Sequence, residues 1–541
     1  MRMNRNYLLL ILLLGFFSLS VSYMDPYRAS NLDITPDSTE YAIGAWHIAS
    51  EAKYFIQIDG KKYPPRYPPW FSMFVISPAY LLSAEIGNGI YPVTFMAVLG
   101  TIMAFFIGRM IAGELGGVLS AVLVLCYPAY RQYSGLIMSD VPCAAGVLAA
   151  CCMYVVVKKD RRLIVWTCAG LLVAFCGALR PEGFAVLVPF AIEVLLIREN
   201  IWAKAWKTAL LMLPSAAIIA ATMLYNNIVF GSPFRNGYKY WCPVPYDYPS
   251  LVFSAKYAVL NLKVLWATMV PLMMILAAGI FYLIRLRKVK TPASFTELKS
   301  VVVFSSLYGF LLVSFHVIYF YPEARFYIPL AALCCVITGG LLSILMLDIN
   351  SKSAKVEKDQ EFIEIKTNGD LHRTLLNFMI IAVLIILCWR MTTEPGKPIK
   401  RLAAESIRRH TPGNSIVISS IDPVYLEFFA GGGGRRFIPI SRTTEYASKM
   451  IAERKIENPD PFPVCWWEHM CPGLLKGGAK LVVPFTVGES PGRIVEAVKN
   501  GVPVFIDSSC ISGTDMLIFK KLEDKMVLMQ CSDTIFQLVL K

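Results

Sequence analysis

Apolar segments long enough to cross a lipid bilayer recur along this 541-residue chain. A helix needs about 20 apolar residues to span the hydrocarbon core, where every backbone polar group has to be satisfied within the helix. We predict eleven crossings, near residues 7–23, 90–107, 114–130, 141–157, 163–179, 183–198, 208–226, 262–284, 300–320, 327–347 and 374–391. Only 17% of the residues are charged, against about 25% in a soluble domain. The sequence therefore predicts a polytopic membrane protein of the mainly α class.

Basic residues are concentrated in the short loops between these segments, and they set the predicted orientation. With the N-terminus in the cytoplasm, all the basic clusters of the short loops fall on the cytoplasmic side, as the positive-inside rule requires. The clusters lie at residues 2–5, 109, 158–162, 198–207, 285–290 and 352–358. The apolar stretch 71–86 is interrupted by Pro78, so we interpret it as an interfacial or re-entrant segment. We expect the protein to lie in the inner or plasma membrane. This topology places its C-terminus on the extracytoplasmic side.

The composition changes near residue 390, and this change suggests two domains. Residues 1–390 are predicted to form the transmembrane domain, with a long first outer loop at 25–69. Residues 391–541 have a soluble composition and are long enough for an independent domain. Short β-like runs alternate there with helical stretches such as 490–499, which predicts a small extracytoplasmic α/β domain. The β-like runs are 415–419, 437–440, 480–484, 502–506 and 536–540.

The first outer loop carries two carboxylates, Asp37 and Glu40, at the start of a helical pattern. One interpretation is a capping box, in which Asp37 caps the helix and Glu40 is its reciprocal partner. The other makes Asp37 a general base, because a carboxylate just outside a bilayer can meet both a lipid-borne reactant and water. The two interpretations are compatible, since a cap also fixes the position of the carboxylate.

A run rich in proline and aromatic residues, from Tyr63 to Trp70, follows in the same loop and surrounds Arg66. Proline cannot continue a helix, and aromatic rings favour the headgroup level of a membrane. The run is therefore interpreted as a rigid interface anchor. In the functional alternative, the run lines the site of the lipid donor or acceptor, and Arg66 lies near the negative charge of the lipid phosphate.

Charged residues also mark three later outer turns. Asp140 begins a helix, where its charge complements the helix dipole, and it is also a second acidic candidate for a substrate site. Arg180 and Glu182 share a very short turn and are expected to pair at the interface. Arg325 and Tyr327 lie in a tight turn between two long crossings. The planar guanidinium of Arg325 suits a phosphate group, which it can grip in two places.

In their order along the chain, these motifs resemble those of the GT-C superfamily of integral membrane glycosyltransferases. The bacterial relatives of protein O-mannosyltransferases and of the lipid A aminoarabinose transferase are nearest in pattern, over residues 1–390. The motifs are the Pro-Asp37-Ser-Thr-Glu-Tyr run, Pro-Pro-Trp70, Asp140, the Arg-Pro-Glu-Gly turn, the Phe-Gly-Ser-Pro loop and the Glu-Ala-Arg325-Phe-Tyr turn. The resemblance implies a helical bundle with its active site at the outer face. It also implies a catalytic aspartate at Asp37, a polyprenyl-phosphate sugar donor and a donor phosphate at Arg325. Protein mannosyltransferases have an adjacent Asp-Glu pair, whereas Ser38 follows here, so the acceptor and the metal requirement stay open.

The predicted activity is the transfer of a sugar from a polyprenyl phosphate to a hydroxyl acceptor on a lipid, glycan or protein, with Asp37 as the base. The candidate substrate-binding residues are Glu40, Arg66, Asp140, Arg180, Glu182, Lys239, Arg325 and Tyr327. The residues indicate no certain cofactor. A divalent metal ion is the only cofactor that we leave as an open possibility. Membrane lipids are expected partners, and nucleic acid is not, because no soluble basic face is present. The alternative is a multi-pass transporter or lipid flippase, which would bury ionisable groups at mid-membrane.

Overall fold

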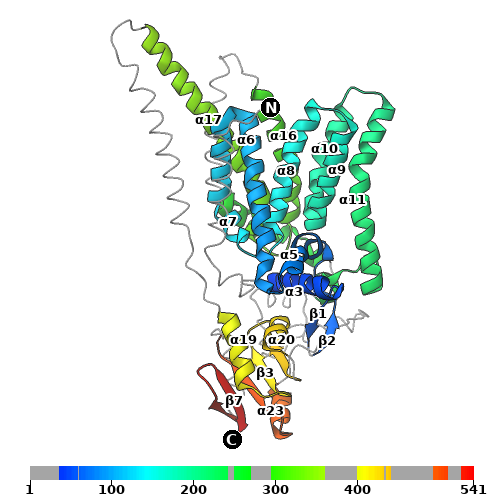
Figure 1. The fold of residues 1–541 in the computed structure, drawn as a ribbon, viewed down its shortest axis with the longest axis vertical. Helices are drawn as coiled ribbons and strands as arrows, with labels where there is room; N and C mark the ends of the chain where they lie inside the picture. The colour runs from blue at the N-terminus through cyan, green and yellow to red at the C-terminus, as the bar shows by residue number, and fades with distance from the viewer. Residues whose placement is uncertain are drawn as a thin grey trace. The chain divides into compact units, whose positions relative to one another are not determined.

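The structure, a computed structural model, is mainly helical (Figure 1). It describes residues 36–58, 60–241, 246, 249–269, 294–359, 399–431, 434–439, 491–509 and 525–541. Within these residues, five helices are long and apolar enough to cross a membrane, judged by length and composition. They are Ile86–Cys126, Asp140–Lys159, Ile201–Phe230, Thr296–Val317 and Ala324–Ile344. The crossings predicted near 7–23 and 374–391, and most of 262–284, lie outside the described residues.

The chain divides into two compact units. The helical unit comprises Met1–Asp25, Ile90–Ala221 and Ser254–Glu394. The loop unit comprises Pro26–Gly89, Thr222–Phe253 and Pro395–Lys541. Three segments that are far apart in the sequence thus build the loop unit, and they join the predicted first outer loop to the C-terminal region. The domain boundary that composition places at residue 390 stays a prediction.

Helix α6 (Ile90–Cys126) of the helical unit is two helices joined by a sharp turn. The backbone leaves helical geometry at Ala112 and at Gly113, which has φ +73° and ψ −163°, a region almost confined to glycine. The two halves then pack against each other, with Phe105 against Val118. A side chain at Gly108 would meet Ser120 Oγ at 2.3 Å, so glycine allows this close approach. The two crossings predicted at 90–107 and 114–130 correspond to these two halves.

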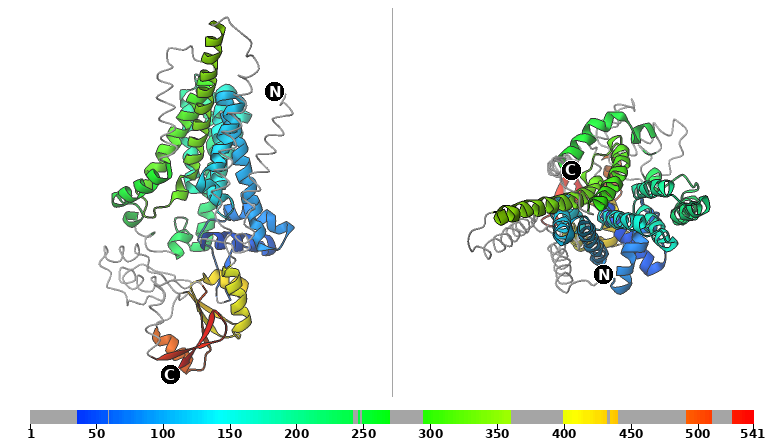
Figure 2. Two further views of the ribbon diagram at one scale, coloured as in Figure 1. Left: turned by 90° about the vertical axis from the view of Figure 1, so that its left-hand side faces the viewer. Right: turned by 90° about the horizontal axis from the view of Figure 1, so that it is seen from above.

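The rest of the helical unit is a bundle around α8 and α17. Its elements are α7 (Pro128–Ser134), α8 (Asp140–Lys159), α9 (Leu163–Leu179), η3 (Pro181–Val186), α10 (Leu187–Leu196), α11 (Ile201–Phe230) as far as Ala221, η4 (Ala255–Tyr257), α16 (Ser294–Val317), η6 (Ala324–Tyr327) and α17 (Ile328–Asp359). Small residues bring α17 onto α6, since Gly339 lies against the backbone of Ser120. Ser120 also donates to the Val336 carbonyl at 3.1 Å. Figure 2, right, shows these helices seen along the bundle.

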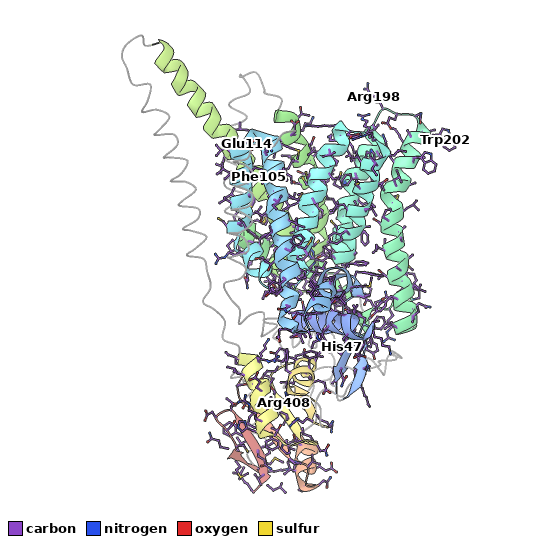
Figure 3. The ribbon with its side chains drawn as sticks, in the orientation of Figure 1. His47, Phe105, Glu114, Arg198, Trp202 and Arg408 are labelled. Carbon is purple, nitrogen blue, oxygen red and sulfur yellow. The ribbon has the colours of Figure 1, made fainter. Side chains whose placement is uncertain are left out.

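The basic loops of the helical unit that the structure describes, near residues 109, 158–162 and 198–207, gather at one end of the bundle. Figure 3 shows Glu114, Arg198 and Trp202 at this end. Ion pairs join the loops to one another, with Arg161 Nη1 3.8 Å from Glu199 Oε1 and Lys159 Nζ 2.6 Å from Glu297 Oε1. This arrangement is the one that the positive-inside rule leads us to expect.

The first segment of the loop unit begins with α3 (Pro36–Glu51) and an antiparallel hairpin of β1 (Ile56–Ile58) and β2 (Lys61–Tyr63). The turn of the hairpin contains Gly60 at φ +71°. The segment continues through α4 (Pro69–Phe71), the π-helical η1 (Ser72–Ile76), α5 (Ser77–Leu82) and η2 (Ile86–Gly89). The apolar helical stretch Pro69–Leu82 is shorter than a full crossing. Helices α12 (Gly237–Trp241) and α14 (Pro249–Val252) come from the second segment.

The C-terminal segment of the loop unit contains a five-stranded mixed sheet of order β4-β3-β5-β7-β6. The strands are β3 (Ile416–Ser419), β4 (Arg436–Pro439), β5 (Val504–Asp507), β6 (Met526–Gln530) and β7 (Ile535–Leu540). Strand β3 runs parallel to β4 and β5, whereas β7 is antiparallel to β5 and β6. Helices α19 (Ile399–His410), α20 (Pro423–Ala430) and α23 (Pro491–Lys499) pack beside the sheet (Figure 2). The mixture of strands and helices predicted for this segment is thus present, as a mixed sheet with helices.

Candidate functional site

The two carboxylates of the first loop lie one turn apart on α3, and Arg66 reaches both. Glu40 accepts three hydrogen bonds from Arg66: Oε2 from the backbone N–H at 2.7 Å, and Oε1 from Nε at 3.0 Å and from Nη2 at 2.5 Å. Arg66 Nη2 also lies 4.0 Å from Asp37 Oδ1. The side chains of Asp37, Glu40 and Arg66 are 13%, 8% and 22% exposed. We call these three residues the Arg66 cluster.

Contacts of the proline-rich run hold Arg66 beside α3. Tyr67 is buried and stacks on Tyr41 of α3, with the ring centroids 4.4 Å apart. On its other side, the Arg66 backbone meets α12, where a Cβ on Gly237 would lie 2.2 Å from the Arg66 carbonyl oxygen. Lys239 is on the same short helix α12. The structure therefore brings the loop of Lys239 to the Arg66 cluster.

The helix cap differs from the one that the sequence suggests. Helix α3 begins at Pro36, and proline suits the first helical position because its missing N–H would have no partner there. Asp37 thus lies in the first turn of the helix. Glu40 bonds with Arg66, which is 26 positions away, and this pairing takes the place of the capping box.

A fourth ionisable group, Asp422, acts on the Arg66 cluster and was not predicted. Burial raises the pKa of Glu40; Arg66 opposes that shift, and the negative charge of Asp422 adds to it. Burial likewise raises the pKa of Asp422, against the Val424 N–H and the charge of Arg66. Asp422 caps α20 by accepting a 2.8 Å hydrogen bond from Val424. The Asp-Pro pair after a β-like run signals such a cap, but nothing in the sequence indicates its partner.

A second cluster lies in the helical unit, and we call it the Arg180 cluster. Arg180 forms ion pairs with Asp140, at the start of α8, and with Glu182, in η3. The Asp140 side chain is 1% exposed. Burial alone would raise the pKa of Glu182, but the charge of Arg180 and the hydrogen bonds of Glu182 outweigh it and lower that pKa. The predicted pair of Arg180 and Glu182 is therefore confirmed, and Asp140 joins it.

Arg325 and Tyr327 lie near the Arg180 cluster, around the ring of Phe326. The guanidinium carbons of Arg180 and Arg325 lie 5.5 and 5.6 Å from the centroid of this ring. The ring of His316 stacks on it, with the centroids 4.6 Å apart and the planes at 11°. The centroid of Tyr327 lies 6.0 Å from that of His316. Two cations, two carboxylates and an aromatic wall thus meet where α8, α9, α16 and η6 converge.

Several buried polar groups of this region form no hydrogen bond among the described residues. They are both ring nitrogens of His316 and the hydroxyls of Tyr308 and Tyr327. These side chains are 3%, 0% and 1% exposed. An unsatisfied buried polar group costs about 1–3 kcal/mol, so such a group usually marks a ligand or water position. His316 was not among the predicted residues, although a lone histidine in an apolar run, in a chain with five histidines, was a visible signal.

The described residues contain no group of three or more His, Cys, Asp or Glu side chains that could hold a metal ion. The Arg66 cluster offers two carboxylates, but Glu40 is already bonded to Arg66 through both of its oxygens. The Arg180 cluster has its two carboxylates on one guanidinium. Neither set of residues therefore provides a ready-made metal site in the part of the chain that the structure describes.

Comparison with solved structures identifies the fold. ArnT from Cupriavidus metallidurans bound to undecaprenyl phosphate matches with a TM-score of 0.56 and 10% identity, over 99% of this chain and 98% of that one. Its apo form matches with a TM-score of 0.56 and 12% identity, over 98% and 97%. The protein has the GT-C fold. A third GT-C structure, the Archaeoglobus fulgidus oligosaccharyltransferase in the apo form, matches with a TM-score of 0.57 and 13% identity, over 94% and 70%.

The likeness lies in the fold, because identities of 10–13% leave few residues in common. No protein-family model matches the sequence. A search of curated protein sequences likewise finds no match. The resemblance to GT-C glycosyltransferases that the order of motifs suggests is thus confirmed at the level of the fold.

Proposed function

We propose that this GT-C protein is a membrane glycosyltransferase that moves a sugar from a polyprenyl phosphate to a hydroxyl acceptor at the extracytoplasmic face. The observation that carries the proposal is the match over nearly the whole chain to ArnT, whose structure holds undecaprenyl phosphate. The two polar clusters support it, because both arise from motifs that resemble those of this superfamily. The basic loops at one end of the helical unit support a cytoplasmic position for that end.

Asp37 is the residue that we assign as the general base. Its neighbour Glu40 has both carboxylate oxygens bonded to Arg66, so Glu40 serves to hold the guanidinium. Asp37 lies at 4.0 Å from the same guanidinium, and its place in the first turn of α3 puts a negative charge where the helix dipole stabilises one. The Glu40–Arg66 pair thus fixes the surroundings of Asp37 while Asp37 does the chemistry.

The proposed reaction is a single displacement. The acceptor hydroxyl oxygen forms a bond to the anomeric carbon as its proton passes to Asp37. The bond from that carbon to the phosphate oxygen breaks, and polyprenyl phosphate leaves with the electron pair. One displacement inverts the anomeric centre. Arg325 is assigned to the leaving phosphate, because a guanidinium stabilises the charge that grows on it.

The Arg180 cluster is assigned to the donor headgroup. Asp140 and Glu182 both pair with Arg180, so its guanidinium is held from two sides. The ring nitrogens of His316 and the hydroxyl of Tyr327 have hydrogen-bonding capacity to spare within the described residues. Sugar hydroxyls both donate and accept hydrogen bonds, and aromatic rings such as Phe326 suit their apolar faces.

The test is mass spectrometry of cell-envelope glycans, lipids and glycoproteins from cells with and without the gene. A sugar that disappears with the gene names the donor sugar and its acceptor. The cells are then complemented with wild type, Asp37→Asn or Ser406→Ala, a surface control on α19. At equal protein abundance, Asp37→Asn should lower the transfer by about 10²–10⁴-fold, the usual contribution of a general base.

Two outcomes would contradict the proposal. If Asp37→Asn restores the sugar as well as wild type does, Asp37 is not the base. If no envelope component changes when the gene is removed, while a lipid accumulates on one leaflet, the protein is a transporter or flippase.

A further inference from the structure

Among the described residues, the short helix α20 of the C-terminal segment contacts the first loop. Glu427 of α20 accepts hydrogen bonds from Gln57 Nε2 and from the Gly60 N–H, both at 3.3 Å. These two donors belong to strand β1 and to the turn of the β1–β2 hairpin. The hairpin is the connection between α3, which carries Asp37, and the run that carries Arg66.

Two further contacts join α20 to the same loop. Phe428 packs edge-on against Trp46 of α3, with the ring centroids 5.4 Å apart and the planes at 82°. At the N-terminus of α20, the charge of Asp422 acts on Glu40 and is itself acted on by Arg66. The helix therefore contacts α3 and the hairpin, and the charge of its cap Asp422 acts on the Arg66 cluster, all within the loop unit.

We propose that α20 is a positioning element for the catalytic loop, with Glu427 and Phe428 as positioning residues that act through the hairpin and α3. The inference rests on the proposed function, since it concerns the geometry of Asp37. A hairpin of two three-residue strands is too small to be stable in water by itself. Glu427 accepts hydrogen bonds from two donors of the hairpin. Through α20, the C-terminal segment thus helps to hold the loop that carries Asp37 in place.

The experiment compares four full-length proteins: wild type, Glu427→Ala, Glu427→Gln and the control Glu405→Ala. Glu405 is on α19, is 41% exposed and forms its ion pairs with Arg401 and Arg409 of the same helix, so it is a matched loss of a glutamate that does not bond the hairpin. Hydrogen exchange of the peptide that covers residues 56–63 is the first measurement. Glu427→Ala should speed exchange there by roughly ten-fold, as expected for the loss of hydrogen bonds to a charged acceptor. Glu427→Gln keeps an acceptor oxygen and should remain near wild type.

Sugar transfer by the same four proteins is the second measurement. Glu427→Ala should lower kcat by about ten-fold or more, because a misplaced catalytic group is costly, with little change in KM for the lipid donor. Glu427→Gln should restore most of the rate. The proposal is wrong if exchange in Glu427→Ala equals that in Glu405→Ala, or if exchange rises and kcat does not fall. If wild type shows no transfer at all, the proposed function fails, whereas the exchange result still decides whether α20 holds the hairpin.

Discussion

Replacing Arg66 by methionine should destabilise the loop unit by about 3 kcal/mol at neutral pH, because it leaves a buried carboxylate without its cation. Glu40 would lose two side-chain hydrogen bonds, from Nε and Nη2 of Arg66, and keep the one from the backbone N–H. Breaking a buried ion pair from one side costs about 3–5 kcal/mol. The Arg66 side chain is 22% exposed, which brings the expected cost to the lower end of this range.

The assay is thermal unfolding of the purified protein in detergent, followed by tryptophan fluorescence. At about 2–4 °C per kcal/mol for a unit of this size, Arg66→Met should lower Tm by roughly 6–12 °C. The deficit should depend on pH. Burial already raises the pKa of Glu40, and loss of the cation raises it further. A carboxyl with a raised folded-state pKa favours folding below its unfolded pKa and loses that advantage as pH rises through the folded value, so the deficit should shrink toward pH 5.

The double variant Glu40→Gln, Arg66→Met provides the control, since it leaves no unpaired carboxylate at position 40. Its Tm should lie well above that of Arg66→Met at about pH 8. The reasoning would be refuted by an Arg66→Met protein that melts like wild type. A deficit that does not change between about pH 8 and pH 5 would also contradict it.

Three further predictions concern other parts of the molecule. Gly113→Ala should cost about 1–3 kcal/mol, because φ +73° with ψ −163° is nearly closed to other residues; a drop in Tm checks it, and an unchanged Tm would contradict it. His47→Phe should remove part of the loss of stability between about pH 7 and pH 5. Burial lowers the pKa of His47 below 6.5, so the neutral ring stabilises the fold above pH 6.5, and this contribution is lost as pH falls through the folded-state pKa. Phenylalanine keeps the stacking on Phe55 and does not titrate. Thermal melting across that pH range is the measurement. His316→Phe keeps the ring on Phe326 and should raise KM for the lipid donor about ten-fold through the loss of hydrogen bonds, as steady-state kinetics would show; an unchanged KM would remove His316 from the donor site.

The helices and the C-terminal strands could be predicted closely, because their signals are local. Apolar length alone places α9 at Leu163–Leu179, the very range predicted, and short β-like runs place β3 and β7 to within a residue at each end. Strand β6 was not predicted, and most of its apolar residues face solvent. The β1–β2 hairpin was also missed, although an Asp-Gly pair between β-like runs is a strong hairpin signal.

The candidate site could be predicted residue by residue but not as a set of contacts. Asp37, Glu40 and Arg66 were each named, yet helical spacing suggested that Glu40 caps its own helix. Nothing local indicates a partner 26 positions away, and the pairing depends on the path of the proline run. The same limit applies to Asp422, whose local role as a helix cap is visible and whose action on Glu40 comes only from tertiary packing. His316 was passed over because its neighbours in the chain are apolar.

The order in which the three segments of the loop unit leave the ribosome has a consequence for biogenesis. Residues 26–89 are made early, whereas Pro395 and the residues after it follow more than 300 positions later. At about 5–20 residues per second, the first segment waits roughly 15–60 s for the helix that contacts its hairpin. During that interval the β1–β2 hairpin lacks the two hydrogen bonds that Glu427 accepts in the finished protein.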